Sequence, residues 1–122
     1  MHPHPDASAE NAALLLSSLL RNCTRLLPKF APGSAQYSLL QNRIAALTLA
    51  LRLLRDGPGT ARCSRAALEA ALPPLRSIQS KTQKISARHG PETPAGRRAQ
   101  AILSAMSLVL PLVEQELART KG

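Results

Sequence analysis

The chain has 122 residues, enough for a single domain, and 44% of them are hydrophobic, mostly Leu and Ala, with one Phe, one Tyr and no Trp. This composition favours helices and argues against a strand-rich fold. Sixteen Lys and Arg against seven Asp and Glu give a formal net charge of +9, so the surface should attract polyanions, anionic lipid or acidic proteins, unless an Arg-rich and Ala-rich coding bias alone produced the charge.

The N-terminal part is predicted to hold a short tail and the first helix. Residues 1–6, which include two His and two Pro, should form a disordered tail, and residues 7–120 should form one helical bundle domain. The first helix is expected from about Ala7 to Leu27, with Pro28 interrupting the pattern at its end. Its apolar residues recur at steps of three and four: Ala12, Leu16, Leu19, Cys23, Leu26 and Phe30.

The second segment has the clearest helical pattern in the chain. Ser34 is a plausible N-cap, and the turn residues from Asp56 to Gly59 should end the helix. The apolar positions of this segment are Tyr37, Leu40, Ile44, Leu47, Leu51 and Leu54.

The third segment is predicted to begin near Ser64 and to end at Gly90 and Pro91. Two prolines, Pro73 and Pro74, lie inside it, and a proline in a helix interior removes a donor and clashes with the preceding turn. We therefore expect a kink or a split into a short and a long helix. The periodic positions are Leu68, Leu72, Leu75, Ile78, Thr82 and Ile85.

The fourth segment follows a loop in which Thr93 can cap the helix and Pro94 can occupy its first position. Its periodic positions are Ala99, Leu103, Met106, Leu110, Val113 and Leu117. Pro111 is a second expected kink. Short connections between helices of similar length predict an all-α fold, an antiparallel up-and-down four-helix bundle with Pro-kinked third and fourth helices. A three-helix arrangement with a frayed first helix is the alternative.

The predicted second and fourth helices are each apolar on two sides. A helix of a simple bundle needs only one apolar face, so these helices carry surplus apolar surface. We expect the surplus to form a self-association interface, most simply in a symmetric dimer. The candidate interface residues are Leu39, Leu49, Leu53, Ala101, Ala105, Leu108 and Leu112. The alternative is that these Leu and Ala residues are exposed helix formers or contact the connecting loops.

The second half of the third helix is the candidate polyanion-binding ridge. Lys81, Lys84 and Arg88 fall within about 60° of one another at helical spacing, with Arg76 beside them, and no acidic residue lies between Arg76 and Arg88. Such a ridge can follow a phosphate backbone, giving salt-dependent affinity with little reading of bases. The competing interpretation is an ordinary solvated helix face.

Arg43 is unusual because it lies between the two apolar stripes of the second helix. It could pair with Glu114 or Glu116, present its guanidinium to a ligand, or extend to solvent at the bundle end. Arg97 and Arg98 open the fourth helix while Glu114 and Glu116 close it, which is the reverse of what the helix dipole favours.

Composition and spacing argue against a metal, a cofactor and an enzyme. Cys23 and Cys63 lack a metal-ligand spacing and are expected to be reduced core residues. His2 and His4 lie in the tail, and His89 stands apart at a helix end. We expect no metal site, because helical bundles bind metals through several inward-facing Glu and His residues. Neither a phosphate loop nor a nucleophile motif is present in the sequence.

The sequence also favours a cytoplasmic protein without a transmembrane segment. Asp6 and Glu10 precede the first apolar run, which makes a poor signal peptide. The longest uncharged run, residues 99–113, falls short of the roughly 18 residues that a membrane span needs.

These observations lead to a non-enzymatic helical interaction or structural module that self-associates and has an unidentified protein partner. The alternative is a DNA- or RNA-backbone-binding protein that uses the ridge on the third helix. Attachment to anionic lipid is a third possibility, which is weakened because aromatic anchors are scarce.

Overall fold

The computed structural model describes residues 6–57 and 63–120, and over those residues the chain is helical with short connections. The bounds of the elements are α1 Asp6–Leu26, the 3-10 turn η1 Leu27–Lys29, α2 Ala35–Asp56, α3 Arg65–Arg88 and α4 Pro94–Arg119. The predicted all-α class and the four helices are confirmed. The predicted tail falls almost entirely on residues 1–5, which lie outside the described residues.

The caps of the three later helices follow the local sequence. Ser34 accepts a hydrogen bond from the backbone N–H of Tyr37 at 3.2 Å, and Ser64 accepts one from Ala67 at 3.1 Å. These bonds satisfy donors that the first turn of a helix leaves without a partner. At the other end of α2, Gly57 has a φ of 84°, a value that glycine adopts without a steric penalty.

Prolines act differently in the first helix and in the later ones. The turn η1 directly follows α1, and Pro28 is its second residue. Helix α1 therefore ends at Leu26, one residue earlier than predicted. By contrast, α3 runs unbroken through Pro73 and Pro74, and α4 runs unbroken through Pro111. The expected split of α3 is therefore wrong, and a kink at these prolines stays a prediction.

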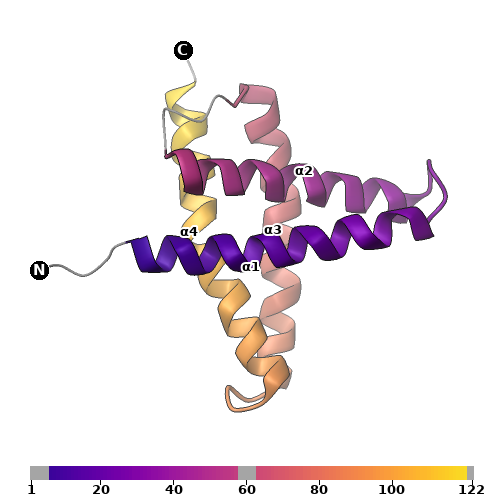
Figure 1. Ribbon diagram of the computed structural model, residues 1–122, viewed down its shortest axis with the longest axis vertical. Helices are drawn as coiled ribbons and strands as arrows, with labels where there is room; N and C mark the ends of the chain where they lie inside the picture. Colours follow the sequence, from indigo (N-terminus) through magenta and orange to yellow (C-terminus); the bar gives the residue numbers. More distant parts are fainter. Residues whose placement is uncertain (1–5, 58–62, 121–122) are drawn as a thin grey trace, which may run out of the picture.

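The four helices form two hairpins, one laid across the other (Figure 1). The first hairpin is α1 with α2 and the second is α3 with α4, and each pair lies side by side. Both α2 and α4 contact all three other helices. Four packed helices are confirmed, and the single up-and-down bundle axis is not confirmed, because the hairpins run across each other.

The core lies where the two hairpins cross, and every helix contributes to it. The largest fully buried side chains are Leu16, Leu47, Leu53, Leu68, Leu75, Met106, Val109 and Val113. Because α1 supplies Leu16 to this core, it is a packed helix, which excludes the three-helix alternative. The crossing leaves the α3–α4 turn outside the core, and that end of the hairpin extends beyond α1 and α2 (Figure 1).

Candidate functional site

The four residues of the predicted ridge are all exposed on α3, but they do not act as one group. Nη2 of Arg76 lies 2.9 Å from Oε2 of Glu114 on α4, so a carboxylate partly neutralises this guanidinium. Lys81, Lys84 and Arg88 have no ion pair within residues 6–57 and 63–120. The ridge therefore reduces to these three cations, which lie in the C-terminal part of α3.

The end of the α3–α4 hairpin carries more positive charge than the ridge alone. Between residues 83 and 98, Gly96 is the one buried residue, in agreement with the extension of this segment past α1 and α2 (Figure 1). Because the turn is short, it brings the first residues of α4 to the end of α3. The resulting basic hairpin end comprises Lys84, Arg88, Arg97 and Arg98, with Glu92 as the acidic residue of the segment.

Hydrogen bonds hold the hairpin end in shape. The Thr93 hydroxyl donates to the carbonyl of Gly90 at 2.8 Å and accepts from the N–H of Gly96 at 3.0 Å. The guanidinium of Arg97 donates to the carbonyl of Glu92 at 2.7 Å. A Cβ added at Gly96 would collide with the carbonyl of Gly90, so the turn depends on a glycine at that position. The cations are thus presented on an ordered scaffold.

Both ends of α4 carry charges that the helix dipole disfavours, and the two ends differ in whether those charges form ion pairs. At the C-terminal end, Glu114 pairs with Arg76 and Glu116 pairs with Arg119 at 3.3 Å, which offsets the dipole. At the N-terminal end, Arg97 and Arg98 add to the positive end of the helix dipole, and no carboxylate in the described part of the chain pairs with them. An anion that binds there gains from the side chains and from the helix terminus together.

A cavity of about 180 Å³ lies at the crossing of the hairpins, beside the base of the ridge. Each helix supplies one apolar wall residue: Leu19, Leu47, Ile78 and Ile102. The remaining lining residues are Cys23, Arg43, Lys81 and Thr82. Since Lys81 is exposed and also lines the cavity, the cavity meets the surface beside this lysine. Sequence reasoning did not find this cavity, because its walls come from four segments distant in the chain.

Arg43 lines this cavity from α2. Its Nε atom is buried and has no hydrogen-bond partner among the described residues. A buried donor without a partner costs about 1–3 kcal/mol, and more when it is charged. The alternative in which Arg43 pairs with Glu114 or Glu116 is wrong, because those carboxylates pair with Arg76 and Arg119. Extension of Arg43 to solvent, another alternative from the sequence, does not hold for its Nε atom, because that atom is buried.

Cys23 faces the same region as an uncharged thiol. Burial raises the pKa of Cys23 above its ordinary value, and the positive charge of Arg43 lowers it by a smaller amount. The thiol therefore keeps its proton at neutral pH and does not compensate the charge of Arg43. Cys23 and Cys63 are both free thiols and both half-buried.

The candidate interface divides into buried and accessible residues. Leu49, Leu53 and Ala105 are buried within the chain itself, with exposed fractions of 7%, 1% and 2%. The expectation that they need a partner is therefore wrong for these three. The physical reason is that α2 and α4 each contact three helices, so their second apolar sides are covered inside one molecule. The other four candidates keep exposed surface: Leu39, Ala101, Leu108 and Leu112.

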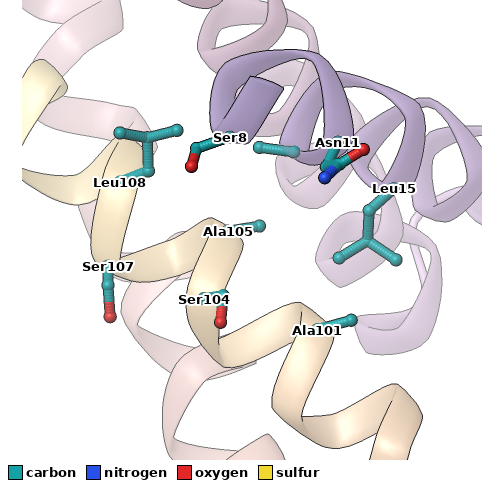
Figure 2. Close-up of a pocket in the computed structure, with 9 residues that line it drawn as sticks. Ser8, Asn11, Leu15, Ala101, Ser104, Ala105, Ser107 and Leu108 are labelled. Carbon is teal, nitrogen blue, oxygen red and sulfur yellow. The ribbon is translucent and has the colours of Figure 1, made fainter. Parts of the chain in front are cut away.

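Two of these accessible residues, Ala101 and Leu108, line a groove between α1 and α4, which has a volume of about 570 Å³ (Figure 2). Alanine, serine, leucine and asparagine side chains line it, and no charged residue is among them. The hydroxyls of Ser104 and Ser107 point away from α1 (Figure 2). On a chain with a formal charge of +9, this groove is a neutral surface.

Two further features concern metal binding and membrane insertion. No three His, Cys, Asp or Glu side chains there come together as a group that could hold a metal ion. Helix α4 is long and apolar enough, by length and composition, to cross a membrane. A helix buried in a protein core passes the same test, and Met106, Val109 and Val113 of α4 are fully buried among the other helices. The absence of a transmembrane segment stays a prediction.

Comparison of the chain with models of protein families, with curated proteins and with solved structures finds no match.

Proposed function

We propose that this protein is a non-enzymatic, cytoplasmic module that binds the phosphate backbone of double-stranded nucleic acid through the basic hairpin end. One observation carries the proposal: Lys84 and Arg88 lie in the last two turns of α3, Arg97 and Arg98 lie in the first two turns of α4, and the end of the hairpin that joins them extends beyond α1 and α2 (Figure 1). Phosphate contacts by Lys and Arg are the main source of affinity in such complexes.

The chemistry of this surface favours backbone contacts over reading of bases. Guanidinium groups match phosphate oxygens in a planar, two-bond geometry, and three of the four cations are arginines. Recognition of single strands relies on bases stacking on aromatic rings. The chain has one Tyr and one Phe, at positions 37 and 30, so the aromatic platforms of single-strand binding are scarce.

The test is the fluorescence anisotropy of a labelled DNA duplex titrated with the protein at about 50 and about 200 mM salt. If four phosphates are neutralised, affinity should fall about 100-fold between the two conditions, because bound counterions are released on association. Replacing Lys84, Arg88, Arg97 and Arg98 by Ala should abolish most binding and flatten the salt dependence.

The matched control replaces two exposed arginines of α2, Arg52 and Arg55, by Ala. This variant loses charge without touching the hairpin end, and its salt dependence should stay close to that of the parent. If net charge alone governs binding, the losses should follow the number of charges removed, so the loss for Arg52 and Arg55 would be half that for the four cations, and this outcome would contradict the proposal. Binding to anionic vesicles but not to duplex would contradict it as well.

A second candidate function, self-association, is favoured by the groove between α1 and α4. Two identical chains with a charge of +9 each repel each other unless they meet at a neutral surface. The groove supplies such a surface, and Leu14 on α1, which is 71% exposed, lies one position before the lining residue Leu15. We infer that a homodimer would use this groove and not the buried part of the predicted interface.

Mass measurement by analytical ultracentrifugation tests this second function at low and high salt. A dimer held by apolar contacts should keep its mass at high salt. Replacing the exposed groove residues Ala101 and Ser104 by Lys should give a folded monomer, whereas Ala118→Lys, an exposed position of α4 outside the groove, should leave the mass unchanged. A monomeric parent protein would eliminate self-association.

A further inference from the structure

The cavity at the crossing of the hairpins combines apolar walls with positive charge. One apolar residue from each helix forms the walls, and the charged groups are Arg43 from α2 and Lys81 from α3. No Asp or Glu is among its lining residues. We propose that this cavity is a binding site for a small organic monocarboxylate with an apolar body, independent of nucleic-acid binding at the hairpin end.

The charge of the cavity determines which end of the ligand it recognises. Arg43 lines the cavity, and its planar guanidinium matches the two oxygens of a carboxylate. The neighbouring Cys23 thiol is uncharged at neutral pH, since burial raises its pKa. No anion among the lining residues therefore competes for Arg43.

The hydroxyl of Thr82 also helps to define the ligand. It donates to the carbonyl of Ile78 at 2.6 Å, so its proton is already used within α3. A carboxylate can thus obtain donors from Arg43 and Lys81 but not from Thr82.

The size of the cavity limits the apolar part of the ligand. Its volume is about 180 Å³, and an apolar cavity of about 150 Å³ is known to accept benzene. The body of the ligand should therefore hold about six carbon atoms. Leu19 and Ile78 line the cavity and are half-buried, so these walls keep hydrocarbon accessible to such a body.

Benzoate serves as the probe, and benzyl alcohol, of nearly the same shape but neutral, serves as its control. The full-length protein is titrated with each compound by isothermal titration calorimetry, while the NMR signals of the methyl groups of Ile78 and Ile102 report where the compound binds. Benzoate should bind with a dissociation constant of about 1 mM or below and shift both methyl signals. Benzyl alcohol should bind about tenfold more weakly.

Variants separate this site from the surface cations. Arg43→Met keeps the length and apolar character of the stem, and it should weaken benzoate binding by about tenfold or more. Arg52→Met removes an exposed charge from the same helix outside the cavity and should leave binding unchanged within about twofold. Arg88→Ala at the hairpin end should also leave it unchanged.

A space-filling variant tests the cavity without altering its charges. Cys23→Leu adds volume beside Arg43 and should abolish benzoate binding while circular dichroism still shows a folded helical protein. The proposal is overturned if benzoate does not bind, if Arg43→Met and Arg52→Met behave alike, or if the shifted signals lie around Lys84 and Arg88 instead of Ile78 and Ile102. If the parent protein binds benzoate but not the DNA duplex, the proposed nucleic-acid function is overturned and the carboxylate site is still supported.

Discussion

At the scale of single residues, the environment of a side chain decides what an ordinary residue type does here. Cys23 and Cys63 are both free and half-buried, but Cys23 shares its surroundings with the charge of Arg43. Gly96 is a helix-breaking residue type, yet it lies in the first turn of α4 because a larger residue would meet the carbonyl of Gly90. Such effects can be tested one position at a time.

The raised pKa of Cys23 predicts a loss of stability at alkaline pH. The unfolded chain releases this proton near pH 9.0, the ordinary value, whereas the folded protein releases it at higher pH. Folding then retains a proton that unfolding releases, so the free energy of unfolding falls as the pH rises above about 9. Denaturant unfolding at about pH 7 and about pH 10 should show a smaller decrease for Cys23→Ala than for the parent. An equal decrease in both proteins would contradict this assignment.

Gly96→Ala should lower the free energy of unfolding by about 1–3 kcal/mol, the range for overpacking. The reason is that the new methyl group would overlap the backbone oxygen of Gly90, which cannot move aside as a flexible side chain can. Thermal unfolding measures the effect. The control is Gly90→Ala, whose methyl group would meet the carboxylate end of Glu92 and should change stability by less than about 0.5 kcal/mol. The reverse order would show that the turn does not depend on Gly96.

At the scale of elements, the helices begin where hydroxyl side chains can satisfy the first backbone donors. Ser34, Ser64 and Thr93 are the N-caps of α2, α3 and α4, and all three follow from local sequence rules. The expectation that prolines interrupt a helix does not hold for α3, which continues through Pro73 and Pro74. Pro74 is buried, which indicates that packing in the core compensates for the lost helical hydrogen bonds.

The two caps of the second hairpin should differ in strength. Ser64 makes one capping hydrogen bond, to Ala67, whereas Thr93 accepts from Gly96 and also donates to the carbonyl of Gly90. Ser64→Ala should therefore cost about 1 kcal/mol and Thr93→Ala about 2 kcal/mol, measured by urea unfolding. A larger cost for Ser64→Ala would mean that the second bond of Thr93 does not stabilise the turn.

At the scale of the whole molecule, crossing the hairpins buries the apolar sides of four helices in one core. Leu16 of the first hairpin and Leu75 of the second are both fully buried in it. Since neither hairpin has a separate core, we expect them to unfold together in one cooperative transition. The α3–α4 turn lies outside this core, which leaves its cations free to meet a ligand.

Leu75→Ala tests this shared core. It should lower the free energy of unfolding by about 2–5 kcal/mol, as large-to-small core substitutions do, and it should lower the midpoint of a single transition. Leu14→Ala, at a position that is 71% exposed, should change stability by less than about 0.5 kcal/mol. Two separate transitions in hydrogen exchange, one for each hairpin, would show that the hairpins are independent.

The candidate site could be predicted only in part from the sequence. Lys81, Lys84 and Arg88 were identified because they share one helix face, which is a local property. The sequence also shows Arg97 and Arg98 at the start of the fourth helix, but the short turn that brings this start to the end of α3 is a feature of the tertiary structure. The cavity around Arg43 was not predicted, since its walls come from four helices and no local pattern marks them.

The helical class, the number of helices and most of their ends follow from the amino-acid pattern alone. Hydrogen bonds in a helix join residues four apart, so a short stretch of chain is enough to specify it. The tertiary structure decided which helices cross, how the second apolar sides of α2 and α4 are covered, and where Arg43 lies. Helix packing depends on how side chains distant in the sequence interlock, and a periodic pattern on one helix does not contain that information.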